Sequence, residues 1–189
     1  MKAFFSDQEF DNIDFNSATF KKGEYDNCIF SKCKFSEVYL SNTHFIECEF
    51  HSCDFSGSHL KNSSFKEVSF MESKLIGMHF FECITLLLSF NFEGCNLSYS
   101  TFENLDLKNT KFKKCNLQHT DFTNANLTSA LFENCDLYGA VFSDTNLENA
   151  DLYSCDNIGL DPEKNTLKNA IFSTHGALSL LSKHQLIIK

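Results

Sequence analysis

Nine cysteines are the residues whose type and spacing first suggest chemistry in this sequence. The stretches NCIFSKCKF (27–35) and ECEFHSCDF (47–55) each hold two cysteines five positions apart, and the second repeats the first after twenty residues. Zinc sites instead draw four converging ligands from C-x₂₋₄-C pairs. None of the seven histidines forms HExxH or stands at ligand spacing from a cysteine pair. We therefore expect no metal and no cofactor, and we interpret the cysteines as small interior residues.

Patterns for catalysis are equally absent from the sequence. It contains no GxSxG, GxxxxGK or GxGxxG segment, and its carboxylates are spread along the chain rather than gathered in pairs. We predict that the protein has no catalytic residues and is not an enzyme.

The cysteines follow a five-residue period that runs through most of the chain. From Phe5 to Phe80, and again from Phe92 to Leu152, every fifth residue is Phe, Leu or Tyr. We call these residues centres. The position two residues before a centre is usually small, and all nine cysteines fall on this position when the two registers are continued to residues 85 and 157. A period of five fits neither a helix nor a flat strand, so the backbone must turn a corner every few residues.

These features resemble the pentapeptide-repeat family, whose consensus A(D/N)LXX is closely matched by ANL (125–127), CDL (135–137) and ADL (150–152). The resemblance implies an all-β fold: a right-handed quadrilateral β-helix with four pentapeptides per coil and about seven coils. Independent support comes from four cysteines that recur every twenty residues and would stack on one face, namely Cys95, Cys115, Cys135 and Cys155.

The expected organisation is a β-helix over residues 3–157 and a C-terminal segment over 158–189 that contains a short helix. A register slip at 81–91 indicates a bulge or small loop between two stacks of coils. Asp161 and Pro162 fit the N-cap and first turn of a helix. The C-terminal segment either caps the stack or pairs two copies, and we favour a homodimer. The residues expected at that interface are Leu178, Leu180, Leu181, Leu186, Ile187 and Ile188.

Charge narrows the choice of partner. The net charge is −9 and all sixteen basic residues are lysines. An acidic chain without the planar fork of arginine is a poor nucleic-acid binder, so we expect no direct nucleic-acid contact. No lysine lies between Lys114 and Lys164. Acidic residues at outward positions there form either a solvated face or a surface for a basic groove: Asp121, Glu133, Asp136, Asp144, Glu148, Asp151 and Asp156.

The Qnr type of the family is similar to this chain in its acidic C-terminal coils and helix-bearing tail. Members of that type are dimeric rods that imitate duplex DNA, bind type II topoisomerases and protect gyrase from quinolones. The resemblance therefore implies a non-catalytic partner of DNA gyrase or topoisomerase IV. The alternative is a general interaction scaffold with an unknown protein partner, contacted through ITLLLSF (84–90). This stretch either lies exposed as a contact patch or fills the interior at the slip. Substitution of Leu87 distinguishes the two, because a buried residue would cost stability whereas an exposed one would cost only binding.

The expected location is the cytoplasm. The most apolar window, residues 75–92, contains His79 and Glu82, which argues against a membrane span. We also expect no signal peptide, because no cationic leader precedes an apolar core. Nine cysteines kept as thiols fit a reducing compartment.

Overall fold

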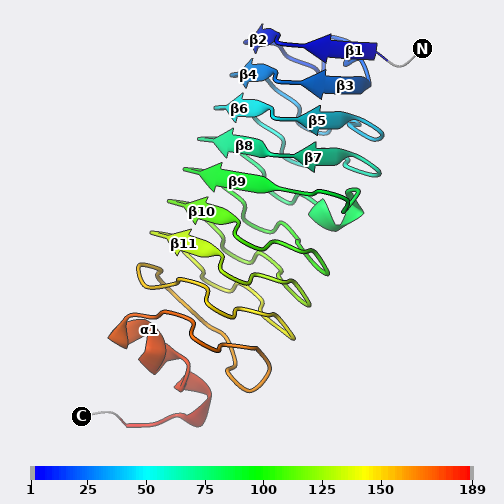
Figure 1. Cartoon of the computed structure of the whole chain (residues 1–189). Coiled ribbons are helices and arrows are strands. Elements are labelled where there is room, and N and C mark those ends of the chain that lie inside the picture. Colours follow the sequence, from blue (N-terminus) through cyan, green and yellow to red (C-terminus); the bar gives the residue numbers. More distant parts are fainter. Residues whose placement is uncertain (1–2, 188–189) are drawn as a thin grey trace.

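The computed structural model describes residues 3–187. The chain winds into a β-solenoid of about seven turns, and each turn lies directly below the one before it (Figure 1). The predicted quadrilateral β-helix is therefore confirmed. Each coil contributes one segment to each of four walls, which we number 1 to 4 in chain order.

Walls 1 and 2 are parallel sheets of short strands. Wall 1 consists, in order, of β1 (Ala3–Ser6), β3 (Gly23–Asp26), β5 (His44–Ile46) and β7 (Ser64–Lys66). Wall 2 consists of β2 (Glu9–Asp11), β4 (Ile29–Ser31), β6 (Glu49–His51), β8 (Val68–Met71), β9 (Phe90–Glu93), β10 (Lys111–Lys113) and β11 (Leu131–Glu133). Neighbouring strands pair in register with an offset of twenty residues, such as Phe10 with Phe30, so that equivalent centres stack on one another.

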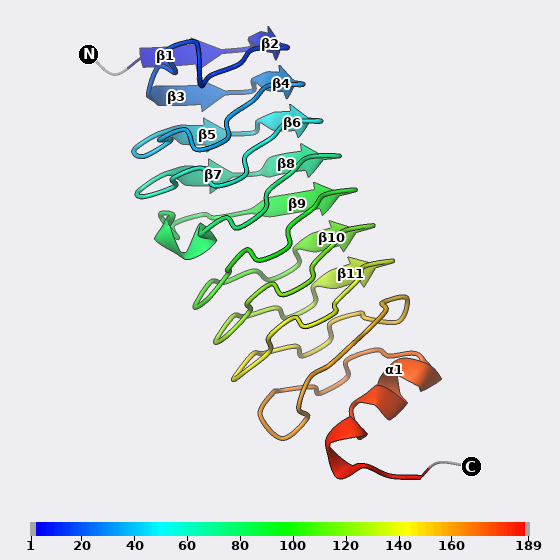
Figure 2. The same cartoon turned by 180° about the vertical axis from the view of Figure 1, so that it is seen from behind.

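Walls 3 and 4 are joined by parallel bridges of single residues rather than by strands. Asn116 pairs with Asp136 on wall 3, and Thr101 pairs with Asp121 on wall 4. Seen from behind, these walls are extended segments without strand arrows (Figure 2). Beyond residue 100, wall 1 continues in the same way, for example through the pair Asp106 and Asn126.

The corners explain why the period is five. Two residues after most centres the backbone adopts a left-handed conformation, with φ of 61° at Asn104 and 57° at Asn124. Asparagine tolerates this region better than most L-residues, because its short side chain forms local hydrogen bonds. The centre and the residue two before it point inward, and the three other residues face outward. Five residues therefore make one wall and one corner.

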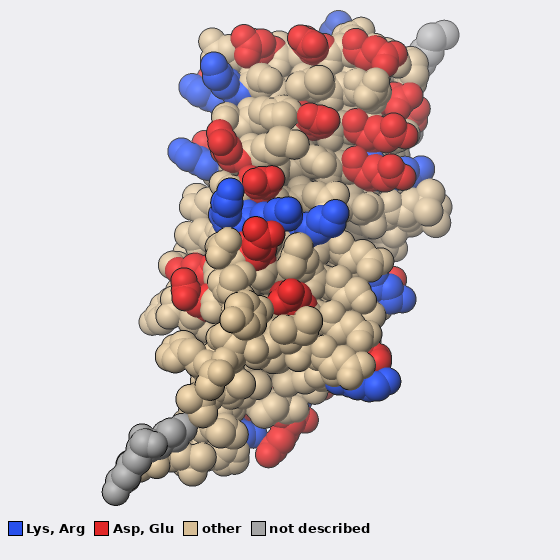
Figure 3. All heavy atoms as spheres, turned by 60° about the vertical axis from the view of Figure 1, so that its left-hand side comes forward, with Lys and Arg blue, Asp and Glu red and all other residues tan. Residues whose placement is uncertain are grey.

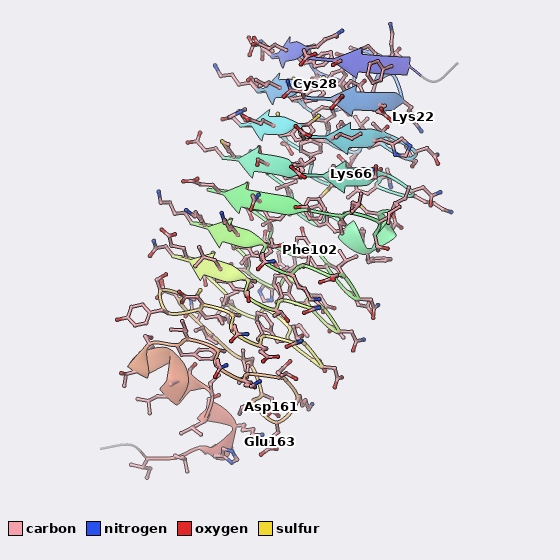
Figure 4. All side chains as sticks on the ribbon, in the orientation of Figure 1. Lys22, Cys28, Lys66, Phe102, Asp161 and Glu163 are labelled. Atoms are coloured by element: carbon pink, nitrogen blue, oxygen red, sulfur yellow. The ribbon has the colours of Figure 1, made fainter. Side chains whose placement is uncertain are left out.

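Stacked aromatic rings fill the interior. On wall 2 the ring centroids of Phe92, Phe112 and Phe132 follow one another at 5.2 and 4.9 Å. Rings on adjoining walls meet edge to face, as Phe102 does with Phe112 at 5.9 Å. Phe102 projects into the stack in Figure 4. Offset stacks and edge-to-face pairs are the favoured aromatic geometries, so each centre holds those above, below and beside it.

The nine cysteines are all free and buried, which confirms their assignment as interior residues. Their thiols help to satisfy the backbone: Cys135 Sγ donates a hydrogen bond to the carbonyl oxygen of Phe112 in the preceding coil at 3.2 Å. Burial raises the pKa of Cys48 to about 12 and that of Cys95 to about 11. These two thiols are therefore neutral and unreactive at physiological pH.

The register slip contains a small loop. After the 3₁₀ helix η1 (Phe80–Glu82) the chain bulges outward, and β9 then pairs with β8 so that Phe92 lies opposite Phe70, an offset of 22 residues instead of twenty. Phe90, which lies outside the five-residue series, is fully buried against Phe65 and Phe80. Leu86 and Leu87 point into solvent and are 71% and 67% exposed.

The C-terminal segment covers the end of the stack with helix α1 (Thr174–Ser179), followed by the 3₁₀ helix η2 (Ser182–His184). Ser173 caps α1, because its hydroxyl accepts a hydrogen bond from the Gly176 amide at 3.1 Å. A Cβ at buried Gly176 would lie 3.1 Å from Ile158 Cδ1, so the helix packs closely on the last coil.

The predicted helix start at Asp161 is wrong. Asp161 Oδ1 accepts a hydrogen bond from the Glu163 amide at 3.0 Å within a turn. Lys183 ties this turn to the C-terminal segment through ion pairs with Asp161 at 2.6 Å and Glu163 at 2.9 Å, and both acids lie beside that segment in Figure 4. The domain boundary at residue 157 remains a prediction, since parallel pairing continues to Ile171.

Candidate protein-binding face

The structure divides the seven predicted carboxylates into two groups. Glu133 and Asp151 lie on wall 2 and Glu148 on wall 1, where lysines are close by. The four others lie on walls 3 and 4 or at the corner that follows wall 4: Asp121, Asp136, Asp144 and Asp156. The seven side chains therefore ring the rod instead of forming one surface.

Positive charge offsets the acidic residues on walls 1 and 2. Lys113 pairs with Glu133 at 3.7 Å, and Lys168 pairs with Glu148 at 2.9 Å. Lys111, also in β10, adds a further cation to wall 2. Figure 3 brings the left-hand side of the rod in Figure 1 forward and shows blue and red side chains next to each other across its middle. This side of the molecule is mixed in charge.

Walls 3 and 4 differ over the C-terminal half of the rod. Residues 95–104, 115–124, 135–144 and 155–157 contain no lysine, and we call this surface the lysine-free face. Its carboxylates are those of Glu103, Asp121, Asp136, Asp144 and Asp156. Between residues 3 and 187, none of these five forms an ion pair. Their negative charge is therefore left to solvent or to a partner.

Hydrogen bonds hold some of these carboxylates in place. Asp121 Oδ1 accepts a hydrogen bond from the Thr123 amide at 2.8 Å. Asp136 accepts three, from the side chain of Asn157 at 2.8 Å, from the side chain of Gln118 at 2.5 Å and from the Tyr138 amide at 3.1 Å. The bond from Asn157 contributes most to lowering the pKa of Asp136, which stays ionised well into the acidic range.

Sequence reasoning overlooked three aromatic residues on this face, Tyr99, His119 and Tyr138. Tyr99 stacks on His119 with a centroid separation of 4.9 Å, and Tyr138 meets the same imidazole edge-on at 5.5 Å. The recurrence of aromatic side chains at 99 and 119, one coil apart, was a signal available in the sequence. It was hidden because these residues are not centres of the five-residue series.

Most of the predicted dimerisation residues lie on the surface. Leu178, Leu181, Leu186 and Ile187 are exposed, whereas Leu180 is partly buried against the core. Ile188 lies outside the described residues. The helix α1 thus covers the coil end with one side, and an apolar strip on the C-terminal segment is left uncovered.

Exposed apolar residues also mark the loop at the register slip. Ile84, Leu86 and Leu87 face solvent, while Leu88 packs against the core and Phe90 is buried. The first half of ITLLLSF is therefore a surface segment, and its second half fills the interior.

Other kinds of site find little support in the part of the chain that the structure describes. Across residues 3–187 there is no group of three or more His, Cys, Asp and Glu side chains arranged to hold a metal ion. Over the same residues, no helix has both the length and the apolar character needed to cross a bilayer.

Comparison with known proteins identifies the fold family. A family model described as a pentapeptide repeat region matches residues 3–80, 43–122 and 85–161. The chain belongs to the pentapeptide-repeat family. This family is defined by its repeat rather than by an enzymatic activity. No curated protein sequence matches the chain.

Solved structures of other pentapeptide-repeat proteins share the fold. Full-length QnrB1, a plasmid-mediated fluoroquinolone resistance protein, is 18% identical, with a TM-score of 0.55, over 97% of this chain and 100% of its own. A trypsin-treated QnrB1 variant is 21% identical with a TM-score of 0.51, covering 99% and 100% of the two chains. HetL of the cyanobacterium Nostoc sp. strain PCC 7120, involved in heterocyst differentiation regulation, is 17% identical with a TM-score of 0.55 over 90% of this chain and 87% of its own. Identities this low establish the fold alone.

Proposed function

We propose that this protein is a non-catalytic, cytoplasmic rod whose lysine-free face binds the DNA-binding groove of a type II topoisomerase, DNA gyrase or topoisomerase IV, and protects it from quinolones. The observation that carries the proposal is the lysine-free face itself, which has five carboxylates on four successive coils, none of them in an ion pair with any residue from 3 to 187. A basic groove that normally holds duplex DNA is complementary to such a surface.

The charge density of the face sets how closely it imitates DNA. Five carboxylates on four coils, with a rise of ~4.8 Å per coil, give roughly one negative charge per 4 Å of rod, against about one per 1.7 Å for duplex DNA. The lysine-free face therefore carries about half the linear charge density of duplex DNA. Its binding should weaken steeply with salt and compete with DNA.

The direct test is DNA supercoiling by purified gyrase, with and without a fluoroquinolone, while the protein is titrated. Rescue from the drug, or salt-sensitive inhibition, supports the proposal. No effect at tens of micromolar protein contradicts it.

Charge-reversal variants then locate the surface. Asp144→Lys combined with Asp156→Lys reverses two carboxylates that make little use of protein hydrogen bonds: Asp144 accepts one long bond of 3.4 Å from Ser143. The matched control is Glu133→Lys combined with Glu148→Lys, which changes the net charge equally on walls 1 and 2. We expect the first pair to abolish the gyrase effect and the control to retain it. Equal losses would show that only total charge matters. Asp136 is a poor probe, because its reversal also breaks three hydrogen bonds.

A homodimer through the C-terminal segment is part of the proposal. Support comes from the exposed apolar side chains of Leu178, Leu181, Leu186 and Ile187. Truncation after Phe172 would also uncover the coil end beneath α1, so point variants are the better test. Leu186→Glu with Ile187→Glu should yield monomers in sedimentation velocity while the circular dichroism spectrum is unchanged. A dimer that survives both changes places the interface elsewhere.

The general scaffold remains a second candidate because Leu86 and Leu87 are exposed on the 81–89 loop. Leu86→Ser with Leu87→Ser distinguishes the two candidates in the supercoiling assay. The DNA-mimic proposal predicts an unchanged gyrase effect, and a loss confined to this loop variant favours contact through the loop.

A further inference from the structure

The aromatic cluster of Tyr99, His119 and Tyr138 is exposed, yet its geometry is defined. Tyr99 is 64% and Tyr138 57% exposed. The Tyr99 ring lies 14° from parallel with the His119 imidazole, and Tyr138 stands at 87° to it. The three rings form a small aromatic platform on the surface of the rod, and buried packing does not account for them.

The backbone is built to carry this platform. Tyr99 and His119 occupy the corner after wall 3 in left-handed conformations, with φ of 60° and 56°. The next residue in this corner column is Gly139, where a Cβ would lie only 2.5 Å from His119 Nδ1. Gly57 and Gly77 occupy the same corner in the two preceding coils. Aromatic side chains therefore appear in this column where the lysine-free face begins, and a glycine makes room for one of them.

Carboxylates flank the platform on both sides. Asp136 lies on wall 3 two residues before Tyr138. In the next coil, the backbone of Asp156 forms a parallel bridge with that of Asp136. On wall 4, Glu103 belongs to the coil of Tyr99, and Asp121 follows His119 by two residues. Aromatic faces and ionised carboxylates attract the same ligand, a cation with a flat apolar surface.

We propose that this platform binds an arginine side chain of a protein partner, with the guanidinium stacked on Tyr99 or Tyr138 and hydrogen-bonded to a neighbouring carboxylate. The planar guanidinium stacks on rings and donates to carboxylates in a fixed fork, which a compact lysine ammonium does not do. The platform specifies which side chain of a protein partner the lysine-free face would recognise, so this inference rests on the proposed function. Nucleic acid is excluded as the occupant, because its phosphates meet only negative charge here.

A second stacked pair provides a matched control. Tyr39 is 63% exposed and stacks on His59 with centroids 4.1 Å apart, but it lies on wall 4 of the N-terminal half, where Lys61 is two residues beyond His59. If exposed Tyr–His pairs serve only to hold coils together, the two pairs will behave alike. If the carboxylate-flanked pair binds arginine, only that one will affect binding.

The experiment measures fluorescence anisotropy of labelled hexa-arginine and hexa-lysine peptides with the full chain at low salt. The variants are Tyr99→Ser with Tyr138→Ser, and Tyr39→Ser as the control. We expect the wild type to prefer hexa-arginine, and the double variant to raise the Kd for hexa-arginine by roughly five- to thirty-fold, removing that preference. Tyr39→Ser should leave both Kd values unchanged.

Three outcomes overturn the inference: no preference of the wild type for arginine, an unchanged Kd in the double variant, or an equal loss in Tyr39→Ser. Circular dichroism melts of each variant establish that the rod is folded at the assay temperature. Failure here with the gyrase effect intact overturns only the arginine platform. Arginine binding by a protein that has no effect on gyrase overturns only the choice of topoisomerase as partner.

Discussion

Leu87 tests whether the loop at the register slip lies outside the coil stack. It stands twenty residues before Leu107, a fully buried centre, so a simple extension of the period would make it a centre too. The structure instead exposes 67% of Leu87 and gives it a left-handed backbone with φ of 58°. We predict that Leu87→Gly hardly changes the free energy of unfolding.

The magnitude follows from three opposing effects. Losing a leucine side chain that is about one-third buried costs about 0.5–1 kcal/mol, and glycine's greater freedom in the unfolded chain costs about 0.5–1 kcal/mol. Relief of the left-handed conformation returns about 1–2 kcal/mol. The net change is within about 1 kcal/mol of zero, whereas Leu107→Ala in the core should cost about 2–5 kcal/mol.

Urea unfolding followed by far-ultraviolet circular dichroism measures both variants. For a chain of this length, 1 kcal/mol corresponds to a Tm shift of about 2–4 °C, so thermal melts provide a second readout. A loss above about 2 kcal/mol for Leu87→Gly would show that this residue lines the interior and that the loop is placed wrongly.

Three further predictions concern the corners, the thiols and the carboxylates. Gly139→Ala should lower the unfolding free energy by about 1–2 kcal/mol, because the added Cβ would meet the His119 ring at a residue whose φ is 67°. Gly159→Ala has open space around the added Cβ and should change the unfolding free energy by less than about 0.5 kcal/mol. Equal effects of the two variants in urea unfolding would contradict the corner geometry. All nine thiols, exemplified by Cys48, should react with Ellman's reagent only after unfolding, and fast reaction of any of them in the native protein would contradict their burial. The lowered pKa of Asp136 contributes stability that is present above its unfolded-state pKa of about 3.9 and is lost as pH falls through the lower pKa of the folded state. Asp136→Asn should therefore lose less unfolding free energy between pH 5 and 2 than the wild type. Identical pH profiles of the two proteins would refute this linkage.

The fold could be predicted from the sequence because each residue's role repeats. A centre every fifth residue, preceded by a small residue, defines what points inward, and the return of Cys95, Cys115 and Cys135 every twenty residues defines the coil. Asp161 shows where local signals mislead, because an aspartate followed by proline starts a turn as readily as a helix. The tertiary pairing of that turn with Lys183 is non-local and left no sign in the sequence.

The candidate site was only partly predictable, because charge counted along the chain averages over four walls. Asp136 and Glu133 are three residues apart, yet they lie on different walls, and only Glu133 has a lysine in the adjacent strand. Sorting outward residues by their place within the twenty-residue coil separates the lysine-free face from the mixed walls. That sorting also requires the two added residues at the slip, whose shape the sequence left open.

The loop at the slip also has a mechanical consequence. Three walls bind the two halves of the rod across it: Val68 pairs with Phe90 on wall 2, Lys74 with Asn96 on wall 3 and His79 with Thr101 on wall 4. Among the described residues, wall 1 has no parallel pairing between β7 and Asp106. On wall 1 the loop is joined to β7 by isolated backbone hydrogen bonds, such as the one that the Ser89 amide donates to the Phe65 carbonyl oxygen at 3.1 Å. With one of its four ladders interrupted at this level, the rod should bend more easily at the slip than elsewhere along the stack, which would help it to follow a curved groove.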